Sequence, residues 1–194
     1  MKKLLGRAFL GLLGWKPEGA APTDPKLVLI AAPHTSNLDA LLLVALSWVF
    51  GVEISFLMKH SWFRGPLGPI SRAVGGVPVR RHLRENLVRQ MVQLFQERER
   101  FVLVVPAEGT RGRAPYWKSG FYQIARAANV PVYFGYLDFG RKRGGFGRKL
   151  VLTGDVKADM DVVRAFYADK QGRHPENAGP IRLREEDVVE VPRS

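Results

Sequence analysis

The sequence predicts an α/β fold with a mostly parallel central sheet flanked by helices. Strand-length apolar runs alternate with segments of helical spacing along most of the chain. Two runs, at 27–32 and 101–105, are apolar throughout, which is typical of strands buried on both faces of a parallel sheet. A length of 194 residues with 46% hydrophobic residues suits one such domain but not two. We expect a single domain over residues 26–194, preceded by a separate segment over 1–16.

The composition limits the classes of function. Thirty Lys and Arg against 18 Asp and Glu give a formal charge of +12, which favours nucleic acid, an anionic lipid surface or an acidic carrier protein as partner. Nucleic acid is not expected, because no known binding fold is recognisable and the basic run 141–143 lies beside two glycines, as in a loop. The chain has no Cys and four scattered His, so the sequence predicts no metal site and no disulfide.

The N-terminal segment 1–16 is predicted to lie on a membrane surface. Lys2, Lys3 and Arg7 alternate with apolar residues, and positions 5, 9, 12 and 13 fall on one helical face, with Trp15 suited to headgroup depth. The alternative is a helix that packs only on its own domain. The next apolar run, 40–50, is too short to cross a bilayer and is expected to be a core helix. We therefore expect peripheral binding at the cytoplasmic face of a membrane.

Each element follows from a local pattern. A Pro-rich linker is expected over 17–25. Ser36 or Asn37 can cap a helix that follows, with Asp39 in its first turn. The apolar spacing of 85–97 predicts a further helix. Gly and Pro punctuate 59–76, which favours a short helix near 69–74. Strands are predicted at 27–32, 52–58, 77–80, 101–105, 130–137 and 150–153, further helices at 121–128 and 160–167, and a polar surface tail from 171.

His34 and Asp39 are the first candidates for catalysis. They lie five positions apart with four residues between them, so on one helix they would point in different directions. With His34 in the loop after a strand and Asp39 in the following helix, the carboxylate can bind one imidazole nitrogen and leave the other to take a proton from a hydroxyl. This is the His-Asp half of a catalytic triad, in which the substrate supplies the hydroxyl. Alone, such a spacing is a weak signal.

Three further blocks follow in order, each at a predicted strand end or start: Gly75-Gly76-Val77-Pro78-Val79-Arg80, Glu108-Gly109-Thr110-Arg111 and Val130-Pro131-Val132. With the His-x4-Asp block, this ordered set resembles the glycerolipid acyltransferase family that includes bacterial lysophosphatidic acid acyltransferases. The resemblance runs from His34 to Val132. It implies a glycerol-3-phosphate acyltransferase-like fold and acyl transfer from acyl-coenzyme A or an acyl carrier protein, with no bound cofactor.

By this resemblance, His34 is the general base, Asp39 orients it, and the acceptor site is lined by Arg80, Glu108, Gly109, Thr110 and Arg111. Guanidinium groups suit a phosphate head, since they grip it with two hydrogen bonds. Two of these assignments have alternatives. Arg80 could be an exposed surface residue, and Glu108 could form an architectural ion pair with Arg111 or Arg113.

The chain departs from the family pattern at two points. Gly112 stands where the family often has Ser, and Tyr133-Phe134-Gly135 replaces a second proline. The resemblance still implies acyl transfer to a lysophospholipid or glycerol phosphate in a membrane, but the two departures leave the identity of the acceptor open. The alternatives are transfer to another lipid head, such as a lyso-aminolipid or sugar, or a non-catalytic lipid-binding relative.

Overall fold

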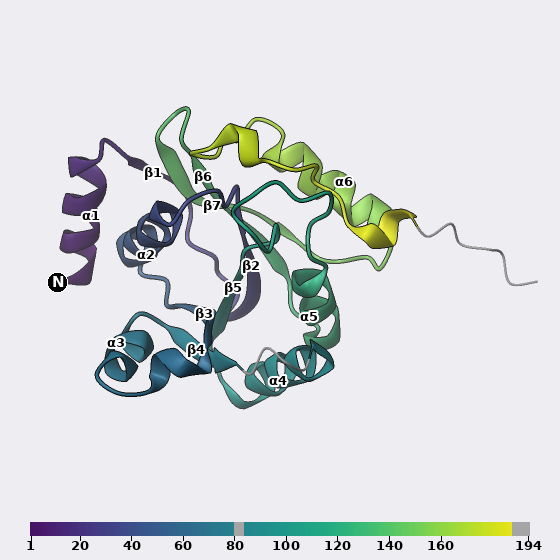
Figure 1. Ribbon diagram of the computed structural model, residues 1–194, viewed down its shortest axis with the longest axis horizontal. Coiled ribbons are helices and arrows are strands. Elements are labelled where there is room, and N and C mark those ends of the chain that lie inside the picture. Colours follow the sequence, from purple (N-terminus) through teal and green to yellow (C-terminus); the bar gives the residue numbers. More distant parts are fainter. Residues whose placement is uncertain (80–83, 188–194) are drawn as a thin grey trace, which may run out of the picture.

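The central feature of the fold is a seven-stranded sheet in the order β1-β7-β6-β2-β5-β3-β4 (Figure 1). The computed structural model describes residues 1–79 and 84–187. Strands β6, β2, β5, β3 and β4 are mutually parallel, whereas β7 is antiparallel to β6 and parallel to β1. The predicted mostly parallel sheet is confirmed. The strands are β1 (Lys16–Gly19), β2 (Lys26–Ala32), β3 (Ile54–Lys59), β4 (Gly76–Val79), β5 (Phe101–Val105), β6 (Val132–Asp138) and β7 (Arg143–Leu150).

Helices flank the sheet in two layers. On one side lie α1 (Lys2–Leu12) and α2 (Leu38–Phe50), and on the other α4 (Arg84–Glu97), α5 (Gly120–Ala128) and α6 (Val156–Tyr167) (Figure 1). The 3-10 helix η1 (His60–Phe63) and α3 (Leu67–Ala73) connect β3 to β4, and η2 (Pro175–Asn177) and η3 (Arg184–Asp187) lie in the C-terminal part. Within the described part of the chain, no helix is both long and apolar enough to cross a bilayer.

The central strand β2 joins two hydrophobic cores. Leu27 and Leu29 pack on the side of α2, while Val28 and Ile30 pack with α4, α5 and α6, and all four are fully buried. Successive side chains of a strand point to opposite faces, so a strand covered on both sides must be apolar at every position. The prediction made from the run 27–32 is therefore confirmed, and the strand ends where Pro33 and His34 begin the loop to α2.

The predictions for 17–25 and 150–153 were wrong at the sheet edge. Residues 17–19, expected in a linker, belong to β1, and the strand predicted at 150–153 is instead β7, which ends at Leu150. The glycines of β7 hid it, because glycine disfavours strands by propensity. Here they permit close backbone approach: a Cβ at Gly145 would lie 1.9 Å from the Glu18 carbonyl oxygen.

The N-terminal helix packs on its own domain and also exposes apolar side chains. In α1, Gly6 and Leu10 are buried against α2, while Leu5 and Leu12 are exposed by 56% and 86%. The placement of Trp15 at headgroup depth was wrong. Its indole is buried and packs edge-on against Phe139, with the ring centroids 4.8 Å apart.

Candidate active site

The loop between β2 and α2 brings His34 and Asp39 together. Asp39 lies in the first turn of α2, and its Oδ2 is 3.2 Å from Nδ1 of His34. The same Oδ2 accepts the backbone N–H groups of Thr35 and Ser36 at 2.8 and 2.9 Å, and the Ser36 hydroxyl donates to Oδ1. Asp39 therefore fixes both the imidazole ring and the backbone of the loop that presents it.

The surroundings of Asp39 keep its carboxylate ionised. Burial alone would raise the pKa of Asp39, but hydrogen bonds from His34 and Ser36 outweigh burial and lower the pKa below its usual value. An ionised carboxylate at this distance favours the tautomer of His34 with the proton on Nδ1. Nε2 is then the nitrogen with a free electron pair. The His34 side chain is 25% exposed and lines the cavity described below.

Glu108 lies beneath the same loop. It follows β5, which pairs in parallel with β2, so the carboxyl ends of the two strands meet. Its Oε2 accepts the backbone N–H of His34 at 2.8 Å. Burial raises the pKa of Glu108 to about 7, although the hydrogen bond from His34 acts in the opposite direction. The hydrogen-bond partner of Glu108 is thus the loop that carries His34, whereas the sequence suggested an ion pair with Arg111 or Arg113.

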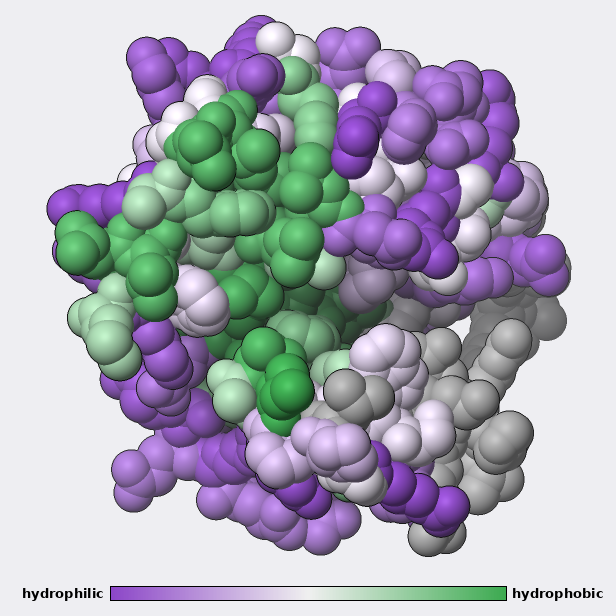
Figure 2. Space-filling model, turned by 60° about the vertical axis from the view of Figure 1, so that its left-hand side comes forward, coloured by the Kyte–Doolittle hydropathy of each residue, from purple (hydrophilic) through white to green (hydrophobic). Residues whose placement is uncertain are grey.

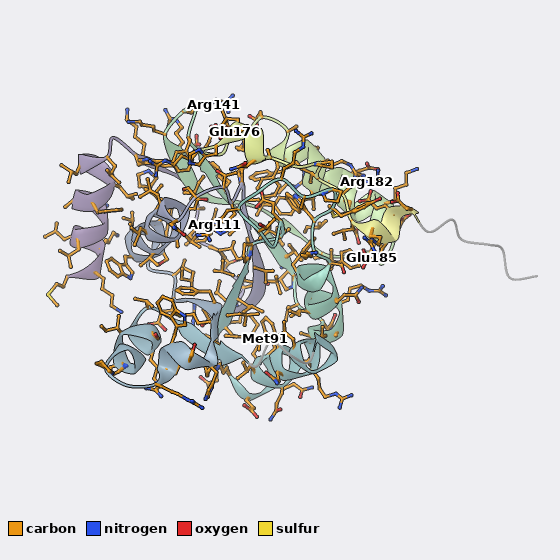
Figure 3. The ribbon with its side chains drawn as sticks, viewed as in Figure 1. Met91, Arg111, Arg141, Glu176, Arg182 and Glu185 are labelled. Atoms are coloured by element: carbon orange, nitrogen blue, oxygen red, sulfur yellow. The ribbon has the colours of Figure 1, made fainter. Side chains whose placement is uncertain are left out.

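The remaining predicted site residues spread from the cavity to the surface. Gly109 has a φ of +69°, which favours glycine, and lines the cavity described below. Thr110 is exposed and its hydroxyl accepts the N–H of Gly112. Arg111, labelled in Figure 3, is also exposed. It donates to the side chain of Asn37, the residue before α2. Arg80 lies outside the described residues.

A mostly apolar cavity of about 760 Å³ opens beside His34 and Asp39. Its walls come from the carboxyl ends of β2, β5 and β6, from β3, and from α2, α4 and α5. Lys118 and Ser119, just before α5, also line the cavity and were not predicted as site residues from the sequence. Their spacing in the sequence does not indicate a site, because they reach the cavity only after the loop from Glu108 folds back. The backbone N–H of Lys118 then donates to the Ala107 carbonyl.

Comparison with known proteins decides the family. The Acyltransferase family matches residues 18–134, which is more than half of the chain and includes the His34 loop and the Glu108 loop. The chain belongs to this acyltransferase family.

Structural comparison agrees with this assignment at the level of the fold. The crystal structure of the 1-acyl-sn-glycerophosphate (LPA) acyltransferase PlsC from Thermotoga maritima is similar, with a TM-score of 0.59 and 19% sequence identity. The similarity covers 86% of this chain and 77% of that one. A search of curated protein sequences finds no match. The acyltransferase thus has a PlsC-like fold, and the fold expected from the ordered motifs is confirmed.

Proposed function

We propose that this acyltransferase moves a fatty acyl group from a thioester, acyl-coenzyme A or acyl carrier protein, to a hydroxyl of a lysophospholipid or glycerol phosphate. The observation that carries the proposal is the placement of the His34–Asp39 pair at an apolar cavity. The pair supplies a general base, and the cavity suits an acyl chain.

The reaction follows from the orientation of His34. Nε2 takes the proton of the acceptor hydroxyl while its oxygen attacks the thioester carbonyl carbon. The carbon–sulfur bond then breaks, and the leaving thiolate takes the proton from the imidazolium. Asp39 stays ionised and stabilises the imidazolium through Nδ1. Each step uses only His34 and Asp39, and the ester and thiol are the products.

The exposed loop after Glu108 suits the phosphate of the acceptor. Arg111 is anchored to Asn37 immediately before α2, so its guanidinium lies next to the positive end of that helix. Arg80, whose position in the family motif suggests the same role, would add a second cation. Glu108 supports the site by accepting the backbone N–H of His34.

The acceptor has to be reached in a membrane, and the exposed apolar side chains suit this. Seven of the eight large apolar side chains that are strongly exposed in the described residues come from α1 and the Met1 that precedes it, α2, η1 and α3: Met1, Leu4, Leu5, Leu12, Leu41, Trp62 and Ile70. Figure 2 shows hydrophobic residues gathered on this face around a hollow. We call these seven side chains the apolar face and propose that it lies on the cytoplasmic membrane surface.

The chemistry is tested by replacing the base. His34→Ala is expected to lower kcat for acyl transfer to a short-chain, water-soluble lysophosphatidic acid at least about 100-fold, as for a lost general base. His60→Ala, at an exposed position of η1, is the matched control and should retain full turnover with a short-chain, water-soluble acceptor. Near-normal turnover by a folded His34→Ala protein would rule out the mechanism.

The phosphate site is tested by a pair of arginines from one loop. Arg111→Ala is expected to raise the KM of the acceptor by about ten- to a hundredfold and leave the KM of the acyl donor unchanged, because charge-assisted hydrogen bonds contribute roughly 1.5–3 kcal/mol. Arg113→Ala, an exposed residue two positions later, is the control. If the KM of the donor rises instead, Arg111 belongs to the thioester side of the site.

A further inference from the structure

The C-terminal segment, residues 169–187, lies against the loop that carries His34. The backbone N–H of His174 donates to Oγ1 of Thr35 at 3.1 Å. Gly172 is buried beside the same side chain: a Cβ at 172 would lie 2.9 Å from both Oγ1 and Cγ2 of Thr35 and 3.2 Å from Cβ of Pro33. The segment therefore touches the residues on both sides of His34.

Thr35 connects this contact to the candidate base. Its side chain accepts from His174, while its own backbone N–H donates to Oδ2 of Asp39, the atom that also faces His34. Thr35 is only 4% exposed, so it has little room to move. A shift of Thr35 would change the distance between Asp39 and the imidazole.

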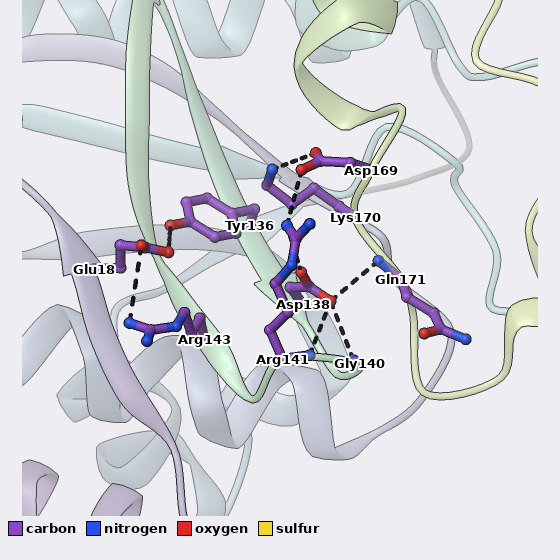
Figure 4. A network of polar contacts seen from close by, with 9 residues as sticks. All are labelled: Glu18, Tyr136, Asp138, Gly140, Arg141, Arg143, Asp169, Lys170 and Gln171. Carbon is purple, nitrogen blue, oxygen red and sulfur yellow. Dashed lines mark hydrogen bonds and ion pairs between the residues drawn. The ribbon is translucent and has the colours of Figure 1, made fainter.

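The segment is fixed at its beginning by a polar network (Figure 4). Asp138, at the end of β6, accepts the backbone N–H of Gln171, and the Gln171 carbonyl accepts the N–H of Phe139 at 2.8 Å. Arg141 forms ion pairs with Asp138 and Asp169. Gly172 thus follows Gln171, which is hydrogen-bonded to the end of β6, and this contact fixes the position of Gly172 beside Thr35.

The later part of the segment holds the second loop of the site. The N–H of Trp117 donates to the Arg182 carbonyl, Leu183 is fully buried, and a Cβ at Gly179 would lie 2.1 Å from the carbonyl oxygen of Ala114. Residues 114 and 117 belong to the loop that runs from Glu108 to α5. One segment therefore spans both loops of the site, and it lies wholly outside the region that matches the family, which ends at residue 134.

We propose that the C-terminal segment holds the His34 loop in its working geometry, with Thr35 and Gly172 as positioning residues. The inference rests on the proposed role of His34 as base. Thr35→Val keeps the shape of the side chain but removes the acceptor for His174, whereas Thr35→Ser keeps that acceptor. Gly172→Ala removes no hydrogen-bonding group, but its added Cβ would press on the Thr35 side chain; the backbone conformation at 172 is open to alanine.

The test combines nitrogen NMR of the His34 ring with kinetics. In the natural protein we expect a protonated Nδ1. Thr35→Val and Gly172→Ala should each shift the ring toward a mixture of tautomers and lower kcat about three- to tenfold, the range for one neutral hydrogen bond, with the acceptor KM unchanged. Thr35→Ser should restore both. Thr153→Val is the control, because Oγ1 of Thr153 likewise accepts a backbone N–H at 3.1 Å, from Asp155, away from the site.

Three results would overturn the proposal: a His34 tautomer and kcat that do not change in Thr35→Val, a Thr35→Ser protein as impaired as Thr35→Val, or equal losses in Thr153→Val. If Thr35→Val does not fold, Gly172→Ala decides by the same two measurements. The NMR reading does not depend on turnover. A natural protein that acylates no acceptor therefore contradicts the proposed function, while the response of the His34 ring still tests the positioning role.

Discussion

The two carboxyl groups around His34 meet different surroundings, and their pKa values move in opposite directions. Asp39 accepts hydrogen bonds from His34, Thr35 and Ser36, and its pKa is lowered. Glu108 accepts a single N–H in a buried position, and its pKa is raised to about 7. One group therefore stays charged beside the imidazole, while the other can be neutral below pH 7. Two full negative charges next to His34 are avoided.

The raised pKa of Glu108 predicts how stability depends on pH. Between its ordinary pKa of 4.5 and about 7, the unfolded chain has lost the proton that the folded protein still holds, so the free energy of unfolding falls as the pH rises. The full effect is about 3 kcal/mol, reached above pH 7. Glu108→Gln cannot titrate, and its carbonyl oxygen can still accept the N–H of His34. Urea unfolding of both proteins from pH 4.5 to 8 should show the steeper fall in the natural protein. Parallel curves would contradict the assignment.

At the scale of single residues, the sequence predicted the contact between His34 and Asp39 correctly but did not predict that Glu108 accepts the backbone N–H of His34. The pair lies within one loop, so local spacing and the start of a helix were enough to place it. Glu108 meets His34 across 74 positions of sequence, through the pairing of β2 with β5. No local pattern encodes that contact, and arginines three and five positions away were the nearer candidates.

Among the elements, the contact between α1 and α2 depends on one glycine. A Cβ at Gly6 would lie 2.7 Å from the Ala45 carbonyl oxygen and 3.2 Å from Cγ2 of Val49, whereas a Cβ at Gly11 of the same helix would have no neighbour within 4 Å. Overpacking costs roughly 1–3 kcal/mol, and replacing an exposed helical glycine by alanine gains up to about 1 kcal/mol. Gly6→Ala should therefore lower the urea midpoint, and Gly11→Ala should raise it. Equal effects would mean that α1 is not held on α2.

The elements that the sequence misplaced share a physical cause. β1 and β7 form through backbone contacts at the edge of the sheet, where Gly19 and Gly145 let the chains approach. Helix α6 begins at Val156, four residues earlier than its apolar spacing indicated, because the side chain of Asp155 accepts the N–H of Ala158 and caps it. Apolar periodicity predicts the interior well, but it does not report contacts made by the backbone.

For the whole molecule, charge and apolar exposure coincide on one side. The segments 1–17 and 60–79, which carry most of the apolar face, contain no acidic residue, and Lys2, Lys3, Arg7, Arg64 and Arg72 are exposed on them. Cations near an anionic membrane contribute about 1 kcal/mol each, and salt weakens this part of the binding. In the proposed membrane contact, the helix expected at 1–16 is one part of a larger surface, to which η1 and α3 add Trp62 and Ile70.

The two parts of the apolar face can be separated by vesicle sedimentation. With vesicles containing phosphatidylglycerol, the double variants Leu5→Gln/Leu12→Gln on α1 and Trp62→Gln/Ile70→Gln on η1 and α3 should each weaken binding by about tenfold or more, because burying a large apolar side chain gains roughly 1.5–3 kcal/mol. Val151→Gln is the matched control, since Val151 is 67% exposed but lies outside the face. High salt should weaken the vesicle binding of the natural protein and of every variant by similar factors. If the Trp62 and Ile70 substitutions leave binding unchanged, only α1 contacts the bilayer. If the Val151 substitution weakens binding as much as the others, the membrane does not select this face.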